Sequence, residues 1–278
     1  MENKWKTAFG CIRGSLHILD GKPCEDWTRK YETNGRLMVT MCDGASRARA
    51  SFHGARIVCQ QTQSWLIHHA EKLFRLDTEE AISLLKCELL NFVLECIDKN
   101  ILSQQYGSRE DYATTLMFFI GNGERYYAGN LGDGMIGCLT PGQGAEVLLE
   151  PENDLWKNRT WHVTSAQANQ HFRIISGEMT KGQTYFMMTD GSVDCLYQRR
   201  KKSFAEALPL LCCWLERDHD ERTISIAMQR RMEQLFPKCT TDDCALSIFR
   251  YRASSPITPI ADEPHLSPTD LEPGETQS

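Results

Sequence analysis

Four aspartates of the chain share one local context, at the end of an apolar segment or in a glycine turn beside one. Asp43 follows LMVTMC, Asp190 follows YFMMT, and Asp133 lies within GNLGDG. Asp242 stands just before the apolar segment CALSIF. A carboxylate at a strand end is held by a rigid scaffold, and the glycine that follows both Asp43 and Asp190 leaves the backbone open to a ligand.

Carboxylates that converge in this way repel one another unless a cation neutralises them. Oxygen ligands without a set of histidines or thiolates favour magnesium or manganese over zinc or copper. Any one Asp-Gly pair is also typical of an ordinary turn without chemistry. The order of the acids, their strand context and the segment KPCED near the N-terminus together favour a metal site.

Composition and charge exclude several classes of protein. The chain has 278 residues, of which 41% are hydrophobic and 24% charged, as in an ordinary soluble domain. Its net charge of -6 argues against binding to a nucleic-acid backbone, which requires a concentrated basic face. No apolar segment approaches the roughly 20 residues that cross a bilayer, and the N-terminus lacks an apolar signal core. We therefore expect a cytoplasmic protein without membrane contact.

The 12 cysteines are scattered from Cys11 to Cys244, without any C-x-x-C spacing. This pattern favours reduced, buried cysteines over a disulfide framework or a structural zinc site. A cysteine nucleophile is disfavoured too, because Cys195 is followed by arginines but lacks a glycine-rich loop to hold phosphate.

Hydrophobic periodicity predicts, in order along the chain, strands, a pair of helices, more strands, a further helical region and a final strand. Residues 52–106 have the spacing of two successive helices, the second capped by Asp77 or Thr78, and residues 203–236 form a further helical region. Short apolar or alternating segments before and after these regions predict mostly antiparallel strands, with GNGE as a hairpin turn. We expect one domain over residues 1–251, with sheets between helical layers, and a disordered acidic tail rich in Pro, Ser and Thr over residues 252–278.

Taken together, the segments that carry the acids resemble the metal-dependent protein phosphatases of type 2C, the PPM family, and most closely its bacterial branch. The resemblance extends in order over residues 11–251 and rests on GSLHILDGKPCED, TMCDGASRARASFHGAR, YATTLMFFI, YYAGNLGDGMIG, MMTDGSVDCL and TTDDCALSIFRY. It implies an α+β fold, a four-layer alpha-beta-beta-alpha sandwich with two mainly antiparallel sheets and a two-metal site in the cleft between them.

Position by position, the resemblance assigns a ligand set. Asp43 would bridge two Mn2+ or Mg2+ ions and Gly44 would contribute its carbonyl. Asp190 and Asp242 would hold one ion, with Asp242 preferred to its neighbour Asp243. The remaining assignments are Glu25 or Asp26 for the other ion, directly or through water, and Asp133 and Asp194 for a third, weaker ion.

The implied activity is hydrolysis of phosphoserine and phosphothreonine in proteins, with Asp43, Asp190 and Asp242 as the catalytic acids. Two cations that share a carboxylate lower the pKa of a bound water and neutralise the phosphate oxygens. The implied partners are phosphorylated proteins and a cognate serine/threonine kinase, in cytoplasmic signalling.

Two features depart from the family pattern. Many members have an arginine four residues before the Glu-Asp pair, where this chain has Gly21. Arg13, His17 or Lys22 could bind the substrate phosphate instead, and His17 matches the G-x-S-H pattern of the bacterial branch.

The second departure is the segment ASRARA after the first Asp-Gly pair. Arg47 and Arg49 are either substrate contacts or solvated side chains. His53 is either a general acid or a structural residue at a helix start, and a metal-bound water could serve as the acid instead. The segment around Asn158 and Thr160 matches a family stretch near the cleft, where ordering of a loop is the role we expect.

Two other functions stay open from the sequence alone. The first is a catalytically weak, phosphatase-like regulatory or binding module, which the position of Gly21 favours and the complete set of acids disfavours. The second is a hydrolase of small phosphoesters on the same fold, since substrate choice depends on loop shape.

Overall fold

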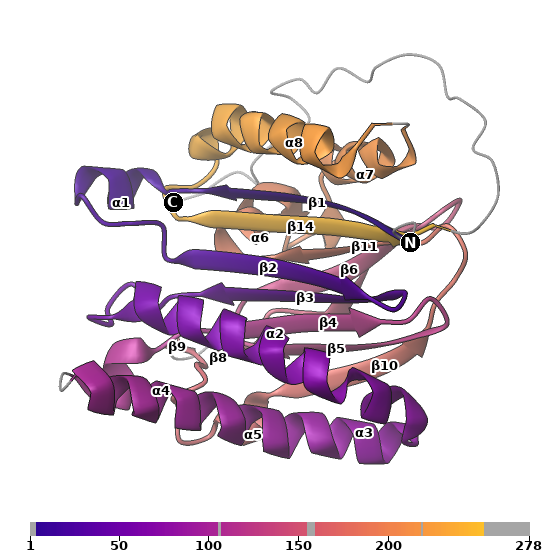
Figure 1. Cartoon of the computed structure of the whole chain (residues 1–278). Helices are drawn as coiled ribbons and strands as arrows, with labels where there is room; N and C mark the ends of the chain where they lie inside the picture. The colour runs from indigo at the N-terminus through magenta and orange to yellow at the C-terminus, as the bar shows by residue number, and fades with distance from the viewer. Residues whose placement is uncertain (1–3, 105–106, 155–158, 218, 253–278) are drawn as a thin grey trace.

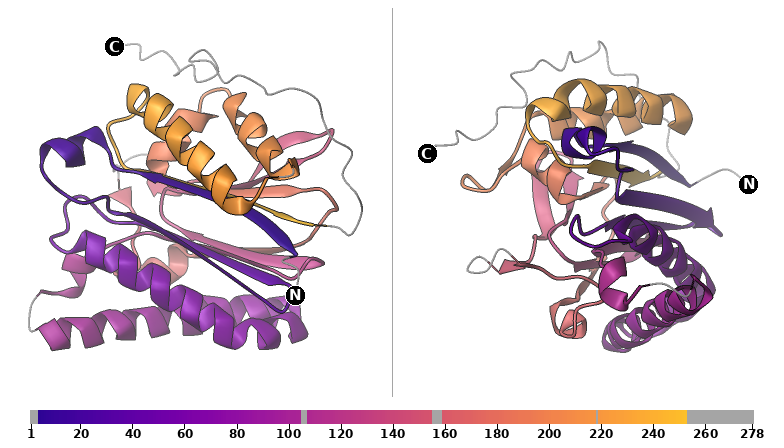
Figure 2. Two further views of the ribbon diagram at one scale, coloured as in Figure 1. Left: turned by 45° about the horizontal axis from the view of Figure 1, so that its top comes forward. Right: turned by 90° about the vertical axis from the view of Figure 1, so that its left-hand side faces the viewer.

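Two five-stranded antiparallel sheets lie face to face, and helices cover the outer face of each (Figures 1 and 2). The computed structural model describes residues 4–104, 107–154, 159–217 and 219–252. In spatial order, the first sheet contains β1 (Trp5–Ile12), β14 (Cys244–Tyr251), β11 (Thr184–Met188), β6 (Met135–Thr140) and β7 (Gly144–Leu149). The second contains β10 (Arg173–Glu178), β5 (Arg125–Leu131), β4 (Leu116–Gly121), β3 (Arg36–Asp43) and β2 (Asp26–Thr33).

The helices fall into two layers. The second sheet is covered by α2 (Ser51–Arg75), α3 (Thr78–Leu84), the π-helical segment η1 (Leu85–Leu89) and α4 (Leu90–Gln104). The first sheet is covered by α6 (Asp190–Leu196), α7 (Ala207–Cys213) and α8 (Glu221–Leu235). The remaining elements are α1 (Ser15–Leu19), α5 (Ala168–His171), the pairs β8 (Asn153–Asp154) with β9 (Arg159–Thr160) and β12 (Tyr197–Gln198) with β13 (Ser203–Phe204), and the 3-10 turns η2 (Arg109–Tyr112), η3 (Trp214–Glu216) and η4 (Phe236–Lys238). The predicted alpha-beta-beta-alpha sandwich is confirmed.

The helix boundaries follow local capping. Asp77 caps α3, its carboxylate accepting a hydrogen bond from the Glu80 amide at 2.9 Å. The region 203–236, expected as helical throughout, instead begins with the short strand β13 and divides into α7 and α8. The division has a local cause, since Asp220 caps a new helix by accepting from the Thr223 amide at 3.0 Å.

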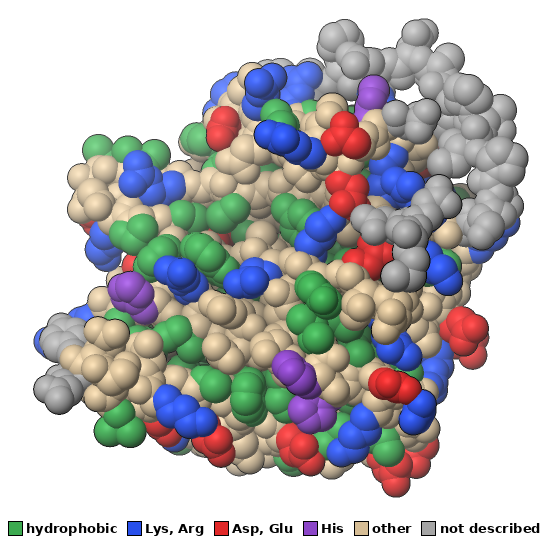
Figure 3. Space-filling model, viewed as in Figure 1, with side chains coloured by type: hydrophobic (Ala, Val, Ile, Leu, Met, Phe, Trp, Pro, Cys, Tyr) green, Lys and Arg blue, Asp and Glu red, His purple; other side chains and the backbone are tan. Residues whose placement is uncertain are grey.

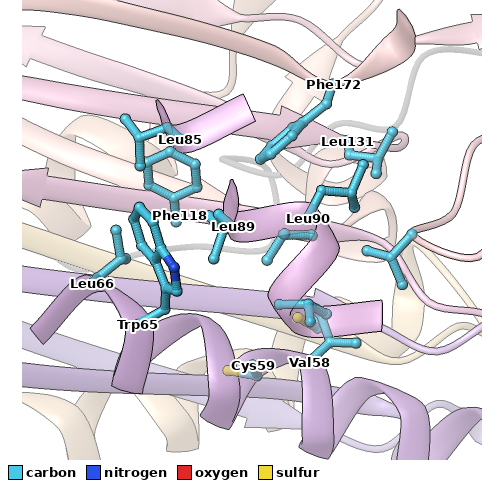
Figure 4. Close-up of a cluster of buried hydrophobic side chains, with 14 of the residues drawn as sticks. Val58, Cys59, Trp65, Leu66, Leu85, Leu89, Leu90, Phe118, Leu131 and Phe172 are labelled. Carbon is cyan, nitrogen blue, oxygen red and sulfur yellow. The ribbon is translucent and has the colours of Figure 1, made fainter. Parts of the chain in front are cut away.

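Strand β4 shows why its sequence is an unbroken apolar run. Successive side chains of a strand point to opposite faces, and both faces of β4 are buried. Phe118 therefore packs under the helices with Trp65 and Leu89 (Figure 4), whereas Phe119 packs between the sheets against Phe249 at a ring separation of 4.7 Å. The strands that carry the acids are thus fixed from two sides.

Several other expectations can be placed. All 12 cysteines lie among the described residues, and none forms a disulfide. No helix in the described part of the chain is both long and apolar enough to cross a bilayer. The tail predicted for residues 252–278 lies outside the described residues except for Arg252, whose amide donates to the Lys4 carbonyl at 2.7 Å, and its disorder stays a prediction.

Candidate metal centre

The acids gather at one end of the sandwich, which faces the viewer in Figure 2 (right). Asp43 is the last residue of β3 and Asp26 the first of β2, and the two are directly opposite in the antiparallel pair. Opposed residues project on the same face of a sheet with their Cβ atoms about 5 Å apart. Asp190 begins α6 just after β11 ends, and Asp242 comes just before β14 begins.

Three carboxylates form the centre of this cluster. One oxygen each from Asp43, Asp133 and Asp190 lies within 4.8 Å of the other two. Asp133 reaches the group from the turn between β5 and β6. The three acids are far apart in the sequence, and the fold brings their carboxylates close enough together to bind one metal ion.

The electrostatics of the cluster are unfavourable without a cation. Burial raises the pKa of Asp43 well above its ordinary range, and the negative charges of Asp190, Asp26 and Asp133 raise it further. Burial, with the charges of Asp133 and Asp242, raises the pKa of Asp190 to about 7. Burial and the neighbouring negative charges both disfavour the ionised carboxylates. A divalent cation bound between them would oppose both shifts, because it stabilises the ionised form of each carboxylate.

Unpartnered oxygens give an independent test of whether a metal fits. Asp26 Oδ1, Asp133 Oδ1 and Glu25 Oε2 are buried without a hydrogen-bond partner among the described residues. A buried polar atom left in this state costs free energy unless something else binds it. These three atoms of the acidic cluster are all carboxylate oxygens, so the residues present fit a hard cation such as Mg2+ or Mn2+.

The backbone of Asp43 is held by two threonines. Thr114 Oγ1 donates to the Asp43 carbonyl at 2.7 Å, and the Thr115 amide donates to the same carbonyl at 2.8 Å. The Asp43 amide in turn donates to Thr115 Oγ1 at 3.0 Å. The sequence predicted a strand that includes these threonines but not their role. Two adjacent hydroxyl side chains directly before a buried strand were the pattern that could have indicated it.

Asp243 fastens the loop before β2 to the start of β14. Its Oδ1 accepts from the Gly14 amide at 2.6 Å, and its Oδ2 accepts from the Glu25 amide at 2.5 Å. The same Oδ2 lies 2.9 Å from Nδ1 of His17, whose Nε2 is 3.8 Å from Glu25 Oε2. Asp243 is therefore fully engaged with protein groups, and its neighbour Asp242 is the freer of the two carboxylates.

Asp242 itself lies at the edge of the cluster. Its side chain is exposed, and its Oδ1 accepts from the Asp243 amide at 2.9 Å. Its carboxylate is not among the three oxygens within 4.8 Å of one another, although its charge contributes to the raised pKa of Asp190. Partial burial raises the pKa of Asp242 as well.

Comparison with known proteins identifies this arrangement. The family described as Protein phosphatase 2C matches residues 13–235 of the chain, which include Asp43, Asp133 and Asp190 and both helical layers but end before Asp242. The chain belongs to the protein phosphatase 2C family. The search of curated proteins found no match.

Several solved structures share the fold at low sequence identity. A serine/threonine phosphatase of S. agalactiae superposes with a TM-score of 0.62 at 12% identity, over 90% of this chain and all of that one (100%). The catalytic domain of the serine/threonine phosphatase PstP, in complex with two manganese ions, gives 0.58 at 14% identity over 90% and 99% of the two chains. RsbX in complex with magnesium gives 0.53 at 12% identity over 90% and 98%.

Within this protein phosphatase 2C domain, the predicted ligands differ in their surroundings. Asp26 and Glu25 are buried, and Gly44 donates its amide to the Glu25 carbonyl at 3.2 Å, which ties the two acidic segments together. A Cβ at Gly44 would lie 2.9 Å from the Ser51 backbone, so α2 approaches too closely for a side chain there. Asp194 lies outside the cluster, on the exposed face of α6, with Arg199 at 3.4 Å.

The residues predicted to bind substrate differ in how close they lie to the acidic cluster. Arg13 is exposed and donates to the Lys22 carbonyl at 3.2 Å, and Lys22 Nζ lies 3.4 Å from the Ser46 carbonyl just after Gly44. His17 is 8% exposed and points inward from α1. His53 is exposed at the start of α2, where its ring contacts that of Phe52. The structure therefore brings Lys22 and His17 near the acids and leaves His53 at the surface.

Short helix α1 has two unlike faces. His17 is buried, whereas Leu16, Ile18 and Leu19 are 55%, 53% and 81% exposed. Their side chains contribute to a hydrophobic area over α1 (Figure 3). The helix is thus held near the acidic cluster chiefly through His17 and Asp243.

Two further sequence interpretations can be located. Thr160 donates to Asp133 Oδ2 at 2.5 Å, which places it beside the centre, whereas Asn158 lies outside the described residues. Cys195 is 6% exposed within α6, so a substrate has no access to it as a nucleophile. Both placements agree with a centre built from carboxylates.

Thr189 orients Asp26 and gives a first testable consequence. Its Oγ1 donates to Asp26 Oδ2 at 2.7 Å and accepts from the Ala245 amide at 2.8 Å. Thr189→Val keeps the shape of the side chain and removes both bonds. We expect the protein to lose about 1–2 kcal/mol of unfolding free energy and manganese affinity to fall about 10-fold, measured by urea denaturation and calorimetric titration.

Thr62→Val is the matched control for this substitution. Thr62 is fully buried in α2, and its hydroxyl has no hydrogen-bond partner among the described residues. The control should leave manganese affinity unchanged and unfolding free energy equal or higher. Equal manganese affinity in both variants would show that Thr189 does not position Asp26.

Proposed function

We propose that this chain is a Mn2+- or Mg2+-dependent phosphatase that hydrolyses phosphoserine and phosphothreonine in proteins. The observation that carries the proposal is the group of Asp43, Asp133 and Asp190, whose carboxylate oxygens lie within 4.8 Å of one another. In a member of the protein phosphatase 2C family, such a cluster has a direct chemical use. The related structure of PstP with two manganese ions supports the same choice of metal.

In the proposed site, Asp43 would serve both ions and Gly44 would contribute its carbonyl. Asp190 and Asp242 would hold one ion, and Glu25 or Asp26 would hold the other. Asp133 belongs to the same centre and stands, with Asp194, as the proposed ligand of a weaker third ion. When bound, the ions supply an ionised water and neutralise charge on the phosphate oxygens.

The chain's own residues perform the positioning. Thr114 and Thr115 fix the backbone of Asp43, and Asp243 holds the loop that carries Glu25. Such preorganisation is worth more in a site shielded from water than at the surface. Lys22 and Arg13 provide positive charge at the rim, where a phosphate dianion would enter.

The test is a substrate panel with purified protein. We expect manganese-dependent hydrolysis of p-nitrophenyl phosphate and of phosphoserine and phosphothreonine peptides, and loss of both activities with EDTA. Phosphotyrosine peptides, nucleotides and sugar phosphates should be poorer substrates. Activity that survives chelation would contradict the role of the metal.

The same panel separates the two other functions. Turnover confined to small phosphates would identify a small-phosphoester hydrolase. Manganese binding by calorimetry, without hydrolysis of any substrate, would identify a phosphatase-like regulatory module. We propose phosphorylated proteins as the partners, together with a serine/threonine kinase that produces them.

A further inference from the structure

A basic hairpin follows α6 directly. The turn between β12 and β13 contains Arg199, Arg200, Lys201 and Lys202, all four exposed, in a chain whose net charge is -6. Among the described residues, Arg199 pairs with Asp194 at 3.4 Å, and no acid lies within 4.0 Å of the other three cations. We name residues 199–202 the basic turn.

The position of the basic turn follows from the geometry of α6. Residues four apart on a helix lie on the same face, so Asp194 extends by one turn the face from which Asp190 enters the acidic cluster. The pairing of Arg199 with Asp194 then places the Arg199 guanidinium beside a residue that lies one helical turn, about 6 Å along α6, beyond Asp190 and outside the acidic cluster.

The hairpin is anchored at its base. Tyr197 and Phe204 are opposite each other in the strand pair, with ring centroids 4.9 Å apart, and Phe204 packs edge-on against Phe186 of β11 at 5.1 Å. The Lys201 amide donates to the Gln198 carbonyl at 3.1 Å and closes the turn. The cations are therefore presented on a fixed support.

We propose that the basic turn binds acidic residues that flank the phosphorylated residue of a protein substrate. The inference rests on the proposed function, which brings a phosphorylated chain to the centre beside it. An acidic peptide complements the uncompensated cations, whereas a long polyanion such as nucleic acid would also meet the acids of the centre and the negative net charge of the domain. Charges at the rim of an interface raise the association rate and the selectivity for a partner, and salt screens them.

The experiment compares R200E/K201E with wild-type protein. Arg199 stays in place because it contacts Asp194. The substrates are p-nitrophenyl phosphate and three phosphothreonine peptides of equal length with acidic, neutral or basic flanks. The matched control is R222E/R230E on α8, where both arginines are exposed and the change in charge is the same.

We expect the wild type to have a kcat/KM about 5-fold higher for the acidic than for the neutral peptide, and R200E/K201E to lose this preference mainly through KM. Activity on p-nitrophenyl phosphate should stay unchanged, and R222E/R230E should keep the preference. High salt should reduce the preference of the wild type.

Binding measured by fluorescence anisotropy separates this inference from the proposed function. If the wild type hydrolyses nothing in manganese, the proposed function fails, and tighter binding of the acidic peptide by wild type than by R200E/K201E would still support the basic turn. Equal binding of the three peptides by the wild type, or a preference for the acidic peptide that survives in R200E/K201E, would overturn the assignment.

Discussion

Asp43→Asn is expected to reduce manganese-dependent hydrolysis of p-nitrophenyl phosphate by at least about 100-fold, since metal-ion catalysis supplies several kcal/mol. Asn keeps the volume of the side chain but removes the charge that the proposed site uses for both ions. The backbone bonds from Thr114 and Thr115 do not involve the carboxylate, so the strand end should stay in place. Steady-state kinetics over a range of manganese concentrations would measure the loss.

The same variant should be more stable than the wild type when metal is absent. The negative charges of Asp190, Asp26 and Asp133 face Asp43, and a neutral residue there removes their repulsion. A ligand at 100 times its dissociation constant adds about 2.7 kcal/mol to the wild type, and most of this gain should vanish in Asp43→Asn. Melting temperatures in EDTA and in manganese would show both effects.

Asp98→Asn is the control for a surface aspartate. Asp98 pairs with Arg109 at the protein surface, where neither activity nor the response to manganese should change. An Asp43→Asn protein with wild-type turnover, or one that manganese still stabilises as fully as the wild type, would contradict the role of Asp43.

In the absence of metal, the unfolding free energy is expected to fall as pH rises from about 4 to about 7. The pKa of Asp190 is raised from its ordinary value of 3.8 to about 7, chiefly by burial. Between these values the folded state holds a proton that the unfolded state has released, so each pH unit removes up to about 1.4 kcal/mol per such group. The loss from Asp190 is nearly complete by about pH 8, one unit above its folded-state pKa.

Other acids of the centre act in the same direction, because burial also raises the pKa of Asp43, Asp26 and Glu25. The pKa values of Asp98 and Asp220 are lowered instead, by hydrogen bonds to Arg109 and Thr223, so their contributions are lost only below this pH range. Glu32, which lies outside the centre, adds to the decline because burial raises its pKa too, so the part of the decline that manganese removes reports on the acidic centre.

Urea denaturation at pH 5, 6, 7 and 8, in EDTA and in manganese, would measure this dependence. Manganese should flatten the decline, because it stabilises the ionised carboxylates, and Asp190→Asn should flatten it without metal. Parallel curves with and without manganese would show that the acids do not form the metal centre.

The strand ends and their acids could be predicted because their causes are local. The segment around Phe118 is apolar without interruption and the one before Asp43 is apolar except for Thr40, as is typical of strands buried on both faces, and an acid or a turn ends each of them. The order of these segments also sufficed for the family resemblance, which the match over residues 13–235 bears out.

The supporting residues could not be predicted, because their partners lie far away along the chain. Thr189 meets Asp26 and Asp243 meets Gly14 only after the two sheets have packed. Local sequence alone does not distinguish Asp242 from Asp243, and only the family resemblance favoured Asp242. The fold turns the Asp243 carboxylate toward the Gly14 and Glu25 amides and leaves Asp242 exposed at the edge of the cluster. The four cations of the basic turn can be read from the sequence. Their position relative to Asp190 could be inferred only from the structure, in which α6 separates them and Arg199 pairs with Asp194.

The strand order of the first sheet has a consequence for synthesis. Strand β1 is made first, yet it pairs with β14 alone, which is made last and lies between β1 and β11. Asp242 and Asp243 come just before β14, so the loop that carries Glu25 stays unfastened until that strand arrives. A nascent chain therefore lacks the bonds that Asp243 makes to Gly14 and Glu25 while the ribosome still holds β14, and the proposed metal centre would be complete only after that strand has been made.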